Sequence, residues 1–342
     1  MSNIKIFVSH RIDIDSEVVD NPIYIPLRCG AVYDERKNIT MQGDDTGDNI
    51  SEKRMSFCEY TVQYWAWKNT QADYYGLCHY RRYLSFAQHQ FKTDEFNMVH
   101  GTALMPRSKM RYGLLNAATM EQVISDYDIV VSEYADVRKI STPCGKKETV
   151  YEMWNAYVGI FFEKSAFDLV FKLIDEMAPR YSKSAREYFS GNLHRGFNCY
   201  VLKKELFERL CEFQFPIMFE VERRLDTTGY TQTMLRTPAF IGEMLYGIFI
   251  YHVTTYEKWG KKELQLVFFN NTERIKGPMD MVKRYILSGV NRGLRAMIDP
   301  IMPVGSRRRE VLKNIYYFVT PTKRMGVAEI QNNCEDYKSC QK

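Results

Sequence analysis

The stretch Asp73–Tyr83, which reads DYYGLCHYRRY, constrains the fold more than any other part of the chain. Tyr74–Cys78 is rich in β-formers and too short for an ordinary helix, whereas Trp65–Asn69 before it is typical of the end of an amphipathic helix. We therefore expect an α/β domain with a strand at Tyr74–Cys78. Open α/β sheets bind ligands at the carboxyl ends of their strands, so the side chains that follow this strand should face a site.

Those side chains are His79, Arg81 and Arg82, which alternate with Tyr80 and Tyr83. Three potentially cationic groups this close repel one another unless an anion lies between them, and arginine forks match phosphate oxygens. The tip is therefore predicted to bind phosphate. The alternative is that Arg81 and Arg82 pair with carboxylates elsewhere in a structural network.

A first strand is predicted at residues 4–10 because the sequence alternates there and ends in polar residues. Ser9 and His10, at its carboxyl end, are candidates for nucleotide contact, although a histidine that ends a strand is as often a satisfied structural residue. The remaining patterns predict strands at 24–27, 127–132 and 196–204, helices at 52–69, 114–125, 149–157, 165–180 and 205–225, and an irregular mobile loop at 88–111.

The loop Gly43–Asn49 carries three carboxylates, Asp44, Asp45 and Asp48. Carboxylates this close repel, so the loop faces water, binds a cation, or accepts hydrogen bonds from the hydroxyls of a ribose or sugar.

Glu243 is the lone acidic residue in the apolar stretch Arg236–Ile250. Burial of a carboxylate is costly unless it is paired or functional, and it raises the pKa towards the range of a general base. We predict a catalytic base at Glu243. The alternative is an ion pair with Arg236, Arg223 or Arg224.

Composition narrows the class of protein. Apolar residues make up 45% of the chain and charged residues 26%, as in soluble globular proteins. There is no apolar run of eighteen residues, and the N-terminus lacks the pattern of a signal peptide, so we expect a cytoplasmic location. The cysteines of the body are scattered without CxxC spacing, which predicts reduced packing residues rather than a zinc site.

Charge is concentrated near the C-terminus. Residues 276–324 hold eleven Lys or Arg against three Asp or Glu, a balance of +8 in a chain whose net charge is +5. Two amphipathic helical patterns, at 281–297 and 311–319, accompany this charge and predict contact with an anionic membrane surface. Alternatively, both helices pack on the body. The mildly acidic remainder argues against nucleic acid as a partner.

Several long motifs make the chain resemble a family of bacterial capsule and O-antigen glycosyltransferases, formerly a domain of unknown function, that includes galactofuranosyltransferases with a GT-A-like fold. The resemblance covers roughly residues 4–255. The motifs are Gly43–Ser51 (GDDTGDNIS), Phe57–Thr61 (FCEYT), Tyr64–Asn69 (YWAWKN) and Gly76–Tyr83 (GLCHYRRY).

The resemblance implies a GT-A-like α/β fold that transfers a hexosyl group, most simply galactofuranose from its UDP donor, to a lipid-linked glycan by inversion. Glu243 would be the base, and Ser9, His10, Asp45, Asn49, His79, Arg81 and Arg82 would bind the donor. Asn198 and Arg236 would bind the acceptor. A pyranosyl transferase of the same pathway, or a non-catalytic sugar-nucleotide-binding scaffold at the membrane, are the alternatives.

GT-A enzymes ordinarily hold a divalent cation with Asp-x-Asp after a central strand. Here His79, Arg81 and Arg82 occupy that position, and the triplets Asp13–Asp15 and Asp126–Asp128 lie elsewhere. We therefore expect no metal cofactor. The expected organisation is a GT-A-like glycosyltransferase domain at 1–275, basic membrane-associating helices at 276–324 and a disordered tail at 325–342, on the inner face of the plasma membrane. The oligomeric state is left open.

Overall fold

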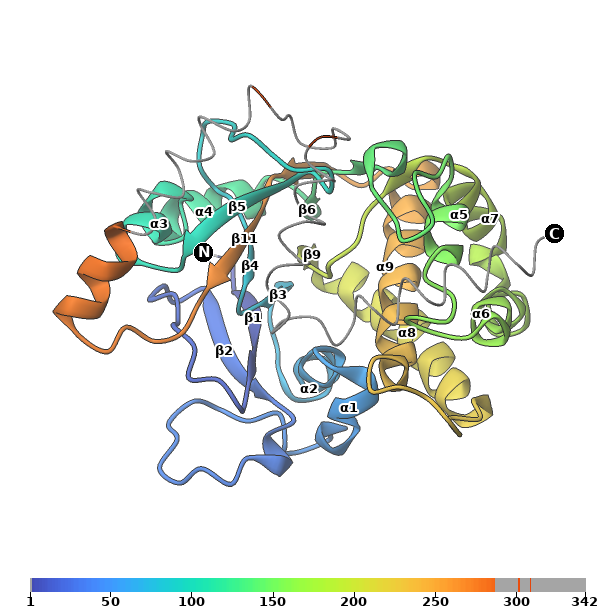
Figure 1. Ribbon diagram of the computed structural model, residues 1–342, viewed down its shortest axis with the longest axis horizontal. Helices are drawn as coiled ribbons and strands as arrows, with labels where there is room; N and C mark the ends of the chain where they lie inside the picture. The colour runs from blue at the N-terminus through green and yellow to red at the C-terminus, as the bar shows by residue number, and fades with distance from the viewer. Residues whose placement is uncertain (1, 287–300, 302–307, 309–342) are drawn as a thin grey trace.

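The computed structural model describes residues 2–286, 301 and 308. A central mixed sheet has helices on both faces, with α5–α9 on the right and α3 and α4 at the upper left in Figure 1. The α/β fold class is confirmed. The predicted helix at 311–319, the tail at 325–342 and most of the basic segment at 276–324 lie outside the described residues.

Three parallel strands build the edge that carries the site. They are β1 (Ile4–Arg11), β2 (Tyr24–Cys29) and β3 (Tyr74–His79), as predicted. β1 lies between the other two, and Ser9 is in register with both Leu27 and His79. The side chains that follow these three strands therefore gather at one edge of the sheet.

The other strands extend the sheet in the order β10-β6-β9-β3-β4-β11-β5. β9 and β4 run antiparallel to β3, so the sheet is mixed. These strands are β4 (Arg82–Leu84), β5 (Met98–Ala103), β6 (Ile129–Ser132), β9 (Tyr200–Lys203), β10 (Lys261–Leu264) and β11 (Leu266–Asn271), with β7 (Ala135–Asp136) and β8 (Leu193–His194) pairing apart from it.

The two faces of the sheet bury two separate cores, because successive side chains of a strand point to opposite faces. On β3, Tyr75 and Leu77 face the larger core with helices α2 and α5–α9, whereas Tyr74 and Cys78 face the smaller core with α4. The helices are α1 (Arg54–Phe57), α2 (Tyr60–Asn69), α3 (Pro106–Arg111), α4 (Ala117–Ser125), α5 (Val150–Asn155), α6 (Lys164–Met177), α7 (Ser182–Ser190), α8 (Lys204–Arg224) and α9 (Thr237–Tyr256).

Two expectations from the sequence were wrong. The stretch 88–111, expected to be an irregular loop, contains β5 and α3. β5 reads MVHGTA and includes a histidine and a glycine, so its strand pattern is weak, and its pairing with β11 supplies what the pattern lacks. The single helix expected at 52–69 is broken at Cys58, which has φ +51° and separates α1 from α2.

The acidic loop 43–49 is held by one of its carboxylates. Asp44 is fully buried and accepts hydrogen bonds from the backbone N–H groups of Gly30 and Ala31 and from the hydroxyls of Ser51 and Thr61. Four donors satisfy the buried charge, so Asp44 fixes the loop against the end of β2 and the start of α2.

Candidate active site

The tip of the β3–β4 hairpin presents two arginines on aromatic rings. His79 and Arg82 face each other across the hairpin, and Tyr80 and Arg81 form the turn. The Arg81 guanidinium lies 5.3 Å from the Tyr80 ring centroid and that of Arg82 lies 4.7 Å from the Phe197 ring, both within cation–π range. The rings thus orient both cations without neutralising them.

Neither arginine makes an ion pair or a side-chain hydrogen bond with any residue in the described part of the chain, and the Nε atom of each is buried without a partner. The described residues thus show no direct ion pair of either arginine with a carboxylate, although the charges of Glu243 and Glu59 lie close enough to Arg82 to act on its pKa. Burial and the nearby cations Arg82 and Arg81 lower the pKa of His79 well below its usual value. His79 is accordingly neutral, and the positive charge of the tip comes from the arginines.

Glu243 lies in the second turn of α9, where it meets the chain just before β9. A Cβ placed on Gly196 would lie 3.7 Å from its Oε2, and the backbone N–H of Phe197 is near enough to lower the pKa of the carboxylate. The residue before it is Gly242, where a Cβ would lie 2.4 Å from Cζ of Tyr60, so only glycine lets α9 approach α2 this closely.

Glu243 forms no ion pair among the described residues. Arg223 and Arg224, two of the partners considered, bind Glu220 instead. The third, Arg236, donates from Nε to the Cys58 sulfur at 3.0 Å. The Glu243 carboxylate is therefore not neutralised by an ion pair with any of these three arginines.

Burial, and after it the negative charge of Glu59, raise the pKa of Glu243 to about 7 against the lowering effects of Arg82 and Arg236. These electrostatic neighbours show that the Glu243 carboxylate lies close to the Arg82 guanidinium. A carboxylate with a pKa near neutrality is suited to take a proton as a general base.

This pKa makes a prediction for stability. Between about pH 4.5 and pH 7 the native state binds a proton at Glu243 that the unfolded state releases, so stability falls as pH rises through this window. The shift corresponds to at most about 3 kcal/mol. Urea unfolding at pH 5 and pH 8 should show Glu243→Gln gaining stability relative to wild type at pH 8 and not at pH 5.

The matched control is Glu212→Gln, an exposed glutamate on α8, which should track wild type at both pH values. An equal effect of Glu243→Gln at pH 5 and pH 8 would show that the carboxylate has an ordinary pKa.

Two further predicted residues, Asn198 and Arg236, lie close to Glu59 and Glu243. Asn198 is 2% exposed and its Nδ2 donates to Oε1 of Glu59 at 3.3 Å. The Arg236 guanidinium lies over Phe240 at 5.3 Å and is close enough to Glu243 to lower its pKa. Contact of either residue with an acceptor stays a prediction. Our sequence reasoning missed Glu59, although it belongs to the FCEYT motif and lies where the expected long helix breaks.

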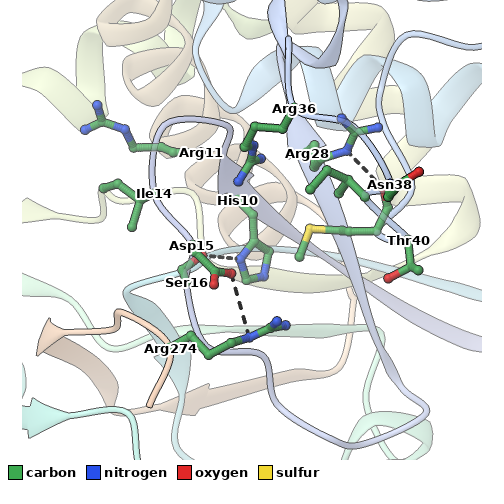
Figure 2. Close-up of a pocket in the computed structure, with 12 residues that line it drawn as sticks. His10, Arg11, Ile14, Asp15, Ser16, Arg28, Arg36, Asn38, Thr40 and Arg274 are labelled. Carbon is green, nitrogen blue, oxygen red and sulfur yellow. Dashed lines mark hydrogen bonds and ion pairs between the residues drawn. The ribbon is translucent and has the colours of Figure 1, made fainter. Parts of the chain in front are cut away.

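A pocket of about 130 Å³ opens beside the tip, at the ends of β1 and β2 (Figure 2). His10 is 2% exposed, its Nδ1 is 2.7 Å from the Ser16 hydroxyl, and its ring is 6.2 Å from that of Tyr80, which belongs to the tip. Burial lowers the pKa of His10 to about 4, so its ring is neutral. The lining also includes four arginines, Arg11, Arg28, Arg36 and Arg274.

The remaining donor-site candidates, Ser9, Asp45 and Asn49, do not line this pocket. Ser9 is buried between β2 and β3 and its carbonyl accepts from the Tyr80 N–H. Asp45 is exposed, and the Asn49 side chain bonds the backbone of its own loop at Gly47 and Ser51. Neither Asp45 nor Asn49 lines the described pocket, so their contact with a donor stays a prediction.

Three of the four carboxylates of the Asp-x-Asp triplets form ion pairs with basic side chains. Asp13 pairs with Arg11 and Arg54, and Asp15 with Arg274. Asp128 pairs with Lys203. Across residues 2–286 no cluster of three or more His, Cys, Asp or Glu side chains has the arrangement of a metal site. Nor is any helix in that part of the chain both long and apolar enough to cross a bilayer.

Comparison with solved structures places this fold among glycosyltransferases. The chain superimposes on the structure described as the WbbM bifunctional glycosyltransferase in its apo form, with a TM-score of 0.71 and 27% sequence identity. The match covers 79% of this chain and 46% of that one, so the chain spans less than half of that protein. A search of curated proteins found no match.

The family is also defined. Residues 5–254 match the model of the family described as a domain of unknown function, DUF4422, and the chain belongs to this family. The match includes the hairpin tip, Glu243 and Asn198.

Proposed function

We propose that the protein is a glycosyltransferase of polysaccharide biosynthesis that moves a hexosyl group from a UDP-sugar to a lipid-linked glycan. The observation that carries this proposal is that a carboxylate with a raised pKa, Glu243, lies close to the guanidinium of Arg82, and that neither forms an ion pair within residues 2–286. The glycosyltransferase neighbour supports the class. UDP-galactofuranose is the first donor to test, because the motifs resemble those of a family that includes galactofuranosyltransferases.

The proposed reaction is a single inverting displacement. Glu243 accepts the proton of an acceptor hydroxyl as its oxygen bonds to the anomeric carbon of the sugar. The bond from that carbon to the diphosphate breaks at the same time, and UDP leaves with the electron pair. Arg81 and Arg82 stabilise the charge that develops on the leaving diphosphate, and neutral His79 can donate one hydrogen bond to it. The arginines provide this charge without a divalent cation.

The pocket at the ends of β1 and β2 is the proposed place for the nucleoside. His10 lines it and lies beside Tyr80, whose ring contacts both His79 and Arg81. A donor could therefore extend from the pocket, past the arginine tip, towards Glu243. Arg36→Ala, which removes a partly exposed pocket cation, should raise the donor KM while leaving kcat within about twofold.

The experiment that tests the function is UDP release by the purified chain against a panel of UDP-hexoses, with and without a short lipid-linked glycan, in EDTA and then in Mn²⁺. Release stimulated by acceptor in EDTA supports the proposal, and the best donor identifies the sugar. A preference for a pyranose would replace the furanose assignment. UDP binding without turnover of any donor would favour a non-catalytic scaffold.

We also propose that the protein works in the cytoplasm, on the anionic inner face of the plasma membrane. The helical residues 278–286 are anchored by Arg284, which is 7% exposed and binds Asp280 and Asn271. The opposite side of this helix exposes Met279, Val282 and Ile286. Exposed apolar side chains next to lysines suit an anionic lipid surface.

Flotation with vesicles tests this location. The full chain should float at least about tenfold more with phosphatidylglycerol vesicles than with phosphatidylcholine vesicles, and Val282→Asp with Ile286→Asp should abolish the difference. Met110→Asp, at another exposed methionine on α3, is the matched control and should float like wild type. Equal flotation of the double variant would remove the helix from the proposal.

A further inference from the structure

The turn that precedes β9 is strained. Phe197 has φ +71° and Asn198 has φ +43°, and neither is glycine. A non-glycine residue in this region costs about 1–3 kcal/mol and persists only when its surroundings hold it there. Two such residues in succession therefore need a specific restraint.

This turn lies against both residues that are proposed to act in the reaction, Glu243 and Arg82. The backbone at Gly196 lies against the Glu243 carboxylate, since a Cβ added there would be 3.7 Å from Oε2, and the Phe197 ring lies 4.7 Å from the Arg82 guanidinium. A change in the turn would thus move backbone away from the proposed base and a ring away from the cation proposed to face the leaving group.

The restraint on this turn comes from Glu59. Asn198 is 2% exposed, and its Nδ2 donates to Oε1 of Glu59, which lies at the break between α1 and α2. The backbone of the neighbouring Cys58 also has a positive φ, +51°, and at this break the Glu59 side chain reaches Asn198. Glu59 forms no ion pair within residues 2–286, so the amide of Asn198 is its defined hydrogen-bond partner there.

We infer that Glu59 is a positioning residue: by binding Asn198 it holds the Phe197–Asn198 turn in the geometry that orients Glu243 and Arg82. The inference rests on the proposed function of those two residues. It gives Glu59, which is 139 residues away from Asn198 in the chain, a role in the transfer reaction without contact with the substrate.

Three variants separate the hydrogen bond from other effects. Glu59→Gln keeps an oxygen that can accept from Asn198 but removes the charge, whereas Glu59→Ala removes both. Asn198→Gly removes the amide and introduces no strain, because glycine adopts positive φ freely. Each of Glu59→Ala and Asn198→Gly should lower kcat about 10- to 100-fold, and Glu59→Gln should stay within about threefold of wild type.

The double variant decides whether the two residues act through one contact. Glu59→Ala with Asn198→Gly should lose no more activity than the worse single variant. Losses that multiply, or a Glu59→Gln variant as slow as Glu59→Ala, would overturn the inference. If Glu59→Ala does not fold, the comparison of Asn198→Gly with Glu59→Gln carries the same test.

A second readout needs no substrate. Hydrogen exchange of a peptide covering residues 196–204 should be at least about tenfold faster in Glu59→Ala and Asn198→Gly than in wild type, and unchanged in Glu59→Gln. Unchanged exchange in all variants would refute the positioning role even if Glu243 proved to be the base. Conversely, faster exchange together with full activity of Glu243→Gln would preserve the restraint and reject the proposed function.

Discussion

Glu243→Gln should lower kcat for sugar transfer by about 10²- to 10⁴-fold, the range contributed by a general base. Glutamine has nearly the shape of glutamate and keeps an acceptor oxygen, but it cannot take a proton at neutral pH. The donor KM should change by less than about threefold, because the arginine tip is intact. Initial rates of acceptor-dependent UDP release provide the measurement.

The pH profile of the wild type provides the second part of this prediction. Ionised Glu243 is the active form, so kcat/KM should fall below a pKa of about 7. Glu212→Gln should show wild-type rates and an unchanged profile. A Glu243→Gln variant within tenfold of wild type would assign the base to another residue.

Arg82→Ala should lower kcat by about 10²- to 10³-fold and weaken donor binding as well. The guanidinium is held on Phe197 and has no partner in the described chain, so it is free to meet the charge that develops on the diphosphate. Arg82→Lys should recover only part of the rate, because lysine keeps the charge but loses the bidentate fork and the stacking surface. The same UDP-release assay measures both variants.

The matched control for Arg82 is Arg111→Ala. Arg111 also lies over an aromatic ring, 5.1 Å from that of Phe91, but it belongs to α3. Its loss should leave kcat and donor KM unchanged. Equal losses in both variants would indicate a general effect of removing stacked arginines rather than a site at the hairpin tip.

The sequence was most informative where a local pattern carries the structure. The strands β1, β2 and β3 have strong patterns, and the amphipathic helix α6 was likewise expected from its apolar spacing. The tip and Glu243 were predicted as site residues for a related reason, since unpaired charges within apolar stretches are costly and therefore informative.

Features that depend on distant partners could not be predicted in this way. β5 is defined by pairing with β11, about 170 residues further along the chain, and the break at Cys58 depends on contacts with Cys29 and Arg236. Glu59 is the clearest case. Its proposed role depends on the hydrogen bond that it accepts from Asn198, and no spacing within the FCEYT motif indicates that contact.

Calorimetric titration with UDP in EDTA tests the central claim, that the arginine tip holds the diphosphate close to Glu243. Wild type should bind UDP, Arg82→Ala should bind at least tenfold more weakly, and Glu243→Gln should bind as well as wild type or better, since it removes a nearby carboxylate. Undiminished binding by Arg82→Ala, or binding by the wild type only after Mn²⁺ is added, would contradict the account.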